Sequence, residues 1–80
     1  MDITLDDVIS MLEDIQEDVD YQTCTTLIDD QIFDSFDILA VVSAADDEFD
    51  VSIPAKDIIP ANFNSAQALC KLIQRLADED

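Results

Sequence analysis

Hydrophobic residues recur every three or four positions in three stretches of the chain, which is the spacing of one face of an α-helix. The first stretch predicts a helix over residues 4–18, with a stripe formed by Leu5, Val8, Ile9, Leu12, Ile15 and Val19. The second predicts a helix over residues 35–49, with a stripe formed by Phe36, Leu39, Val42 and Phe49 and widened by Ile38, Val41 and Ala45. The third begins at Asn64 or Ser65 and has a stripe formed by Ala66, Leu69, Cys70, Ile73 and Leu76.

The segments between these stretches lack a lasting period. Residues 20–34 are rich in Thr, Asp and Gln and predict a long loop, held on the core by Leu27, Ile28, Ile32 and Phe33. Pro54 suits the first turn of a helix and Pro60 would end one, so we expect a short third helix over residues 55–59. The predicted fold is therefore all-α, a small four-helix bundle of three longer helices and one short helix in a single domain spanning residues 1–80.

The composition favours a folded and strongly acidic domain. The chain has 80 residues, of which 49% are hydrophobic, and twenty carboxylates against three cations give a net charge of −17. Nucleic acid and anionic membranes are disfavoured as partners because they would be repelled, whereas basic surfaces of other proteins would be attracted. There is no glycine, so turns that need a positive φ are expected to use Asn or Asp.

The chemistry-bearing residues do not suggest an enzyme that acts alone. The stretch "IFDSFDIL" places Ser35 between two aspartates, but the chain has no histidine to take its proton. Cys24 and Cys70 have neither metal-ligand nor redox spacing. Residues 46–57 carry acids in part of a calcium-loop pattern but lack its central glycine and its final glutamate, so we expect no dedicated metal site. Ser35 is then either an ordinary helix cap or a residue that another protein modifies.

The sequence also predicts where the protein works. The N-terminus, "MDITLDDV", has no basic region followed by an apolar run, and no apolar stretch is long enough to span a bilayer. We therefore expect a monomer in the cytoplasm, with reduced thiols.

Three stretches together resemble the acyl carrier protein family, whose members are also called phosphopantetheine-carrier domains. They are Asp34-Ser35-Phe36 at the start of the second predicted helix, "EFDVSIP" at residues 48–54, and "NSAQALCKLI" at residues 64–73. The resemblance implies that a phosphopantetheinyl transferase attaches 4′-phosphopantetheine to Ser35, flanked by Asp34 and Phe36. It also implies that partner enzymes bring basic patches to the second helix, with docking residues Asp37, Asp46, Asp47 and Glu48.

The resemblance leaves the cargo open. Phe36 stands where Leu is more usual in the family, and no glycine precedes the Asp-Ser pair, which makes "IFDSF" look closer to D-alanyl carriers and to stand-alone carriers of specialised pathways. Partners would be acyl- or aminoacyl-loading and transferring enzymes. The expected function is to present thioester-bound acyl intermediates in fatty-acid, polyketide or related biosynthesis, with an aminoacyl (D-alanyl or peptidyl) carrier as the alternative. An alternative of another class is an acidic interaction or divalent-cation-binding helical module without a prosthetic group.

Overall fold

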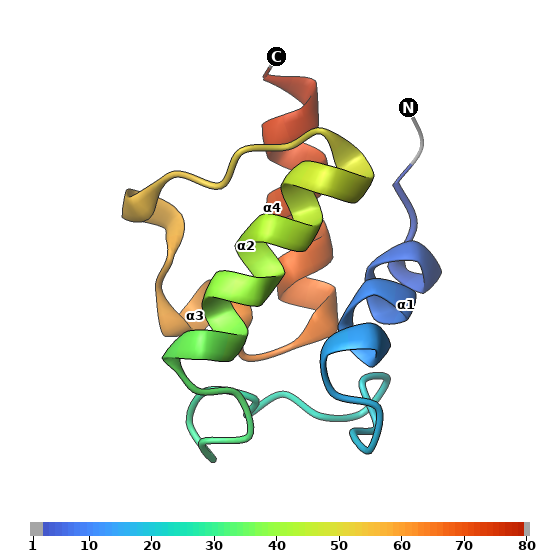
Figure 1. Cartoon of the computed structure of the whole chain (residues 1–80), viewed down its shortest axis with the longest axis vertical. Coiled ribbons are helices and arrows are strands. Elements are labelled where there is room, and N and C mark those ends of the chain that lie inside the picture. The colour runs from blue at the N-terminus through green and yellow to red at the C-terminus, as the bar shows by residue number, and fades with distance from the viewer. Residues whose placement is uncertain (1–2, 80) are drawn as a thin grey trace.

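A computed structural model describes residues 3–79 and consists of four α-helices joined by loops (Figure 1). The elements are α1 (Leu5–Ile15), α2 (Ser35–Phe49), a 3-10 turn η1 (Ala55–Asp57), α3 (Pro60–Phe63) and α4 (Ala66–Asp78). Helix α1 packs against both α2 and α4, and α3 packs against α4. Residues 3–79 contain no strand. The predicted all-α bundle of three longer helices and one short helix is confirmed.

Short polar side chains begin the first and last helices, and Ser65 is one of the two residues expected to begin the last. The Thr4 hydroxyl accepts a hydrogen bond from the Asp7 backbone N–H at 3.2 Å, and the Asp7 carboxylate accepts one from the Thr4 N–H at 3.1 Å. At the start of α4 the Ser65 hydroxyl accepts from the Ala68 N–H at 3.0 Å. Each bond satisfies a backbone donor that has no partner within the helix, which fixes where the helix starts.

Helix α1 ends at Ile15, so the predicted end at residue 18 is wrong. Gln16 leaves the helical conformation with φ −140° and ψ 112°. The hydroxyl of Tyr21 lies 3.1 Å from the Leu12 carbonyl oxygen and also meets the Gln16 carbonyl oxygen. The Leu12 carbonyl oxygen also accepts the Gln16 backbone N–H at 2.9 Å, so the buried tyrosine adds a second contact at the end of α1 and one to the Gln16 carbonyl just beyond it.

The short third helix lies later in the chain than expected. Residues 55–57 form only the 3-10 turn η1, and the helix itself, α3, begins at Pro60, which we expected to end a helix. Proline is well suited to the first helical position, because the N–H that it lacks would have no partner there. The predicted helix over residues 55–59 is therefore wrong in its bounds.

The buried face of α2 also differs from the prediction. The side chains of Phe36 and Leu39 are 79% and 62% exposed, so these two residues do not belong to the core. Three other residues of the predicted face, Val41, Ala45 and Phe49, are buried and are spaced four residues apart. Helix α2 has apolar residues on more than one face, and the helical period alone does not show which face is buried.

The loop before α2 is anchored as expected. Leu27 and Phe33 are buried, and Ile28 and Ile32 pack against the core from partly exposed positions. Sequence reasoning missed the burial of Tyr21, whose ring meets Phe33 edge-on at 6.2 Å between ring centres. Met11 and Leu72 are further core residues outside the predicted stripes. No helix in the part of the chain that the structure describes is both long and apolar enough to cross a membrane.

Candidate functional site

Ser35 is the first residue of α2, and its side chain is exposed. The N-cap of the helix is Asp34, whose carboxylate accepts a hydrogen bond from the Asp37 N–H at 3.0 Å. The Asp37 carboxylate accepts one in return from the Asp34 N–H at 3.3 Å. Within residues 3–79 no side-chain hydrogen bond involves the Ser35 hydroxyl. The interpretation of Ser35 as an ordinary cap is wrong, because the two aspartates already perform that role.

Gln16, the residue that follows α1, holds the segment that carries Ser35. The side-chain amide of Gln16 donates to the Ile32 carbonyl oxygen at 2.6 Å and to the Asp37 carboxylate at 2.8 Å. Gln16 thus joins the end of α1 to the loop before the serine and to the capping pair after it. No local pattern predicts this contact, because it bridges positions far apart along the chain.

The loop residues that precede Ser35 are packed on the buried core. The Phe33 N–H donates to the Leu27 carbonyl oxygen at 2.8 Å, which closes the turn before Ser35. Gln31 adopts a positive φ of 58° in that turn, whereas the expectation that Asn or Asp would take such positions holds at Asp50, with φ 55°. Burial of Tyr21, with a smaller contribution from Glu13, raises the pKa of its phenol to about 12. Ser35 therefore follows a loop that is closed by a backbone hydrogen bond and packed on buried residues.

An apolar patch lies beside Ser35. Phe36 and Leu39 are three residues apart on α2 and so occupy neighbouring positions on its surface. Both are large side chains that face solvent, and Ile59 before α3 is a third, at 46% exposure. The exposure of Phe36 does not fit its place in the predicted core stripe, and its role beside the phosphopantetheine arm stays a prediction. Leu39 was missed, because its spacing matched the stripe assigned to the core.

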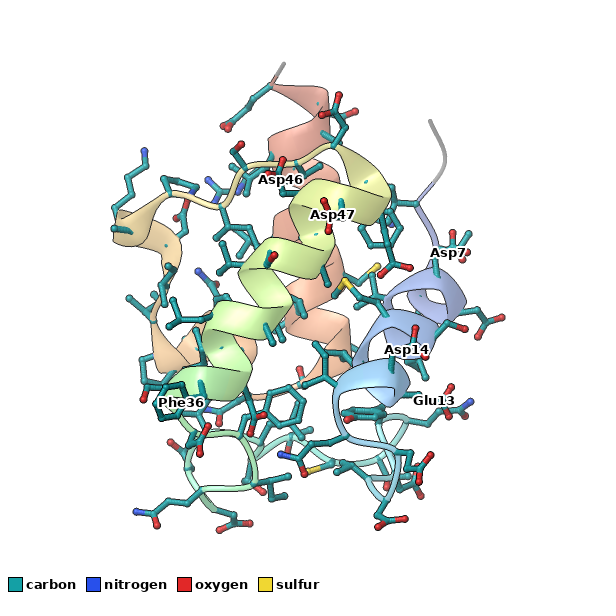
Figure 2. The ribbon with its side chains drawn as sticks, in the orientation of Figure 1. Asp7, Glu13, Asp14, Phe36, Asp46 and Asp47 are labelled. Carbon is teal, nitrogen blue, oxygen red and sulfur yellow. The ribbon has the colours of Figure 1, made fainter. Side chains whose placement is uncertain are left out.

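The predicted docking acids divide into two groups. Asp46, Asp47 and Glu48 are exposed near the C-terminal end of α2, and Phe36 lies at the other end (Figure 2). A rise of about 1.5 Å per residue puts Asp46 about 16 Å along the axis from the serine. Asp37 is only half-exposed, and its carboxylate already binds Gln16 and the capping N–H. These contacts indicate that the first role of Asp37 is to stabilise the start of α2.

The remaining candidates for chemistry do not form a metal centre. The acids of residues 46–57 do not gather, and Asp57 forms an ion pair with Arg75 at 3.2 Å. Within residues 3–79 no group of three or more His, Cys, Asp or Glu side chains is placed to hold a metal ion. Cys24 and Cys70 are both free thiols. Burial, with a smaller effect from Asp7, raises the pKa of the Cys70 thiol, which makes it less reactive.

Searches against protein-family models, curated proteins and solved structures found no match to this chain. The site must therefore be interpreted from its own residues.

Proposed function

We propose that the protein is a carrier that bears a 4′-phosphopantetheine arm on Ser35 and presents thioester-bound intermediates to partner enzymes. The observation that carries the proposal is an exposed serine hydroxyl at the first position of a long helix, where Asp34 and Asp37 already provide the cap. Because the Ser35 hydroxyl is exposed and does not cap the helix, a transferase can approach it. The resemblance of Asp34-Ser35-Phe36 to the acyl carrier protein motif indicates that the attached group is 4′-phosphopantetheine.

The electrostatics of the helix start suit a tethered phosphodiester. Backbone N–H groups and the positive end of the helix dipole favour a phosphate at this position. The carboxylates of Asp34 and Asp37 would repel it, although each also accepts a backbone hydrogen bond. The phosphate would then be attached without being tightly held, so the arm could swing between partners. The thiol of the arm would carry the cargo, so no side chain of this chain needs to act as a base.

Partner binding follows from the surface of α2. The apolar side chains of Phe36 and Leu39 lie next to the serine, and Asp46, Asp47 and Glu48 lie at the far end of the same helix. A partner with a basic patch would be steered by the acids and would then bury the two apolar side chains beside the arm.

The cargo within this proposal is acyl, with aminoacyl as the alternative. The large aromatic Phe36 beside the serine is the feature that favours D-alanyl or other specialised carriers over fatty-acid carriers, by resemblance alone. The proposed partners are a phosphopantetheinyl transferase and the enzymes that load and unload the arm, in the cytoplasm.

The direct test uses coenzyme A and a broad-specificity phosphopantetheinyl transferase. Intact-mass measurement should show the addition of one arm, and peptide mapping should place it on Ser35. Ser43→Ala, which changes another exposed serine of α2, is the matched control and should be modified normally, whereas Ser35→Ala should gain no mass. No mass gain with several transferases, or a gain that persists in Ser35→Ala, would favour an acidic interaction module without a prosthetic group.

Docking is tested separately by charge reversal. Replacing Asp46 and Asp47 with Lys should slow association with a partner enzyme and flatten its dependence on salt. Stopped-flow rates at several salt concentrations provide the measurement, and the same reversal at Asp6 and Asp14 on α1 is the control for total charge. Equal rates for the α2 variant and the unchanged protein would show that these acids are only solvated surface.

A further inference from the structure

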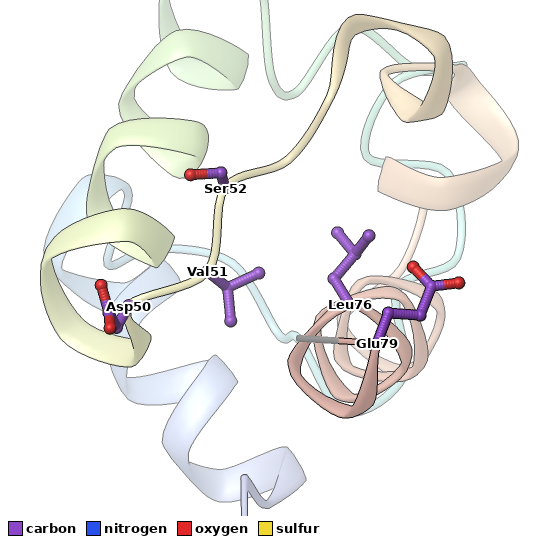
Figure 3. A pocket seen from close by; sticks show the side chains of 5 residues that line it. All are labelled: Asp50, Val51, Ser52, Leu76 and Glu79. Carbon is purple, nitrogen blue, oxygen red and sulfur yellow. The ribbon is translucent and has the colours of Figure 1, made fainter.

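The connection between α2 and α3 is anchored at its ends and loosely held in its middle. It starts beside α4, where Val51 and Leu76 line the same small cleft (Figure 3), and Val51 and Ile53 are buried. The chain then runs out to the left of α2 in Figure 1 before it turns back to α3, where Phe63 is buried. None of residues 54–62 between these anchors is buried. Segments with so little buried surface are among the first to open in a folded protein.

The hydrogen bonds of residues 54–59, which we call the strap, are all local. The Asp57 N–H donates to the Pro54 carbonyl oxygen at 3.0 Å, and the Asn62 side chain donates to the Asp57 carbonyl oxygen at 2.9 Å. Within residues 3–79 no hydrogen bond of the strap reaches beyond Asn62. A single turn of helix is marginal in water, so these bonds do not hold the strap against the helices and are lost when it is released.

One ion pair joins the strap to the rest of the molecule. The Asp57 Oδ1 atom lies 3.2 Å from a guanidinium nitrogen of Arg75 on α4. Among the residues that the structure describes this is the one ion pair, although the chain has twenty carboxylates. Ile58 adds an apolar contact, since it packs against the core from a partly exposed position. The position of the strap therefore depends on Arg75 and on one partly buried isoleucine.

The second oxygen of the Asp57 carboxylate opposes the closed position. The Asp57 side chain is only 15% exposed, against 52% for Arg75. Its Oδ2 atom is buried and has no hydrogen-bond partner within residues 3–79. A buried carboxylate oxygen without a donor is less stable than one in water, so opening the strap relieves this cost. The ion pair and the desolvation of Oδ2 act in opposite directions, which leaves only a small net preference for the closed strap.

We propose that the strap opens as a unit about its buried ends while α1, α2 and α4 stay folded, with the ion pair between Arg75 and Asp57 as its latch. Opening brings the Asp57 carboxylate into water and uncovers the part of the core against which Ile58 packs. Because the latch is an ion pair with a half-exposed arginine, added salt weakens it. The strap is independent of Ser35, so the proposal stands whether or not the serine carries an arm.

The test is amide exchange with water, measured by NMR magnetisation transfer on the whole protein. The reporters are the N–H groups of Asp57, Ile58 and Ile59, each of which bonds to a carbonyl of the strap. Arg75→Gln should quicken their exchange about two- to fivefold at low salt, the range for a half-exposed ion pair. Buried amides such as that of Val41 should exchange as they do in the unchanged protein.

Two controls separate the latch from a general effect of charge. Lys71→Gln removes an exposed cation one turn earlier on α4 that belongs to no ion pair within residues 3–79, and it should leave exchange of the strap unchanged. In the Asp57→Asn background, Arg75→Gln should have no further effect. The ratio of rates between Arg75→Gln and the unchanged protein should fall toward one between roughly 0.01 M and roughly 1 M NaCl, as the Debye length shortens from about 30 Å to about 3 Å.

Three results would overturn the proposal. One is a Lys71→Gln variant whose strap exchanges as fast as that of Arg75→Gln. Another is an equal effect of Arg75→Gln with and without the Asp57 carboxylate, or a ratio of rates that does not change with salt. The third is faster exchange at every amide together, which would mean that Arg75 stabilises the whole fold and that the strap does not open by itself.

Discussion

Gln16→Ala should destabilise the protein, because the side chain of Gln16 joins the end of α1 to both sides of the serine. The lost bonds are those to the Ile32 carbonyl at 2.6 Å and to the Asp37 carboxylate at 2.8 Å, in a partly buried setting. A neutral hydrogen bond contributes about 0.5–1.5 kcal/mol and one to a charged group about 1.5–3 kcal/mol. Allowing for partial exposure, we expect a loss of about 2–3 kcal/mol, which for a domain of this size lowers Tm by about 10–20 °C.

The assay is urea denaturation followed by circular dichroism, with Gln67→Ala as the matched control. Gln67 also ties a loop to a helix, but through a single exposed hydrogen bond to the Gln22 carbonyl oxygen at 3.1 Å. Its loss should cost less than about 1 kcal/mol. Amide exchange near Ser35 should quicken in Gln16→Ala and not in Gln67→Ala. Equal losses of stability in the two variants would refute the inference that Gln16 holds the serine segment.

Three further predictions concern the cap, the buried phenol and the surface charge. Ser35→Ala should change the unfolding free energy by no more than about 0.5 kcal/mol, whereas Asp34→Ala should cost about 0.5–2 kcal/mol, because only Asp34 is the cap. The pKa of Tyr21 is raised from 10.0 to about 12, so the stabilisation from its neutral form is complete below pH 10 and lost as the pH rises through 12. Ultraviolet titration of this single tyrosine should show the shift, and Tyr21→Phe should lack that part of the alkaline loss. Finally, Tm should rise with NaCl and further with Ca²⁺ or Mg²⁺ at equal ionic strength, the two ions acting alike; a rise with Ca²⁺ alone would contradict the absence of a calcium loop.

The helical period located the three longer helices and identified the buried faces of α1 and α4, but it did not separate the buried residues of α2 from the exposed ones. Helix α2 is the clearest case, since Phe36 and Leu39 satisfy the same spacing rule as the residues that are buried. The spacing rule concerns one helix, whereas burial depends on where α1 and α4 lie against it. The same limit explains why Met11 and Leu72 were missed.

The position of Ser35 at the start of a helix could be predicted from the sequence, but the contacts that hold the preceding loop could not. Asp34-Ser35-Phe36 is a local motif, and the capping pattern of an acid with another acid three residues later is local too. The Gln16 side chain reaches a carbonyl 16 positions away and the Tyr21 hydroxyl one 9 positions away, and backbone carbonyls leave no signature in the neighbouring residues. The left-handed Gln31 was also beyond prediction, because tight closure of the loop imposes a conformation that its side chain does not favour.

The central claim is that Ser35 carries a phosphopantetheine arm, and the most direct measurement is the mass of the protein isolated from its native host. Fragmentation of the peptide containing Ser35 should release the arm, and any additional mass on it would identify the cargo as acyl or aminoacyl. The account predicts that Ser35 is modified in the cell. An unmodified Ser35 in cells whose other carrier proteins are loaded would contradict it.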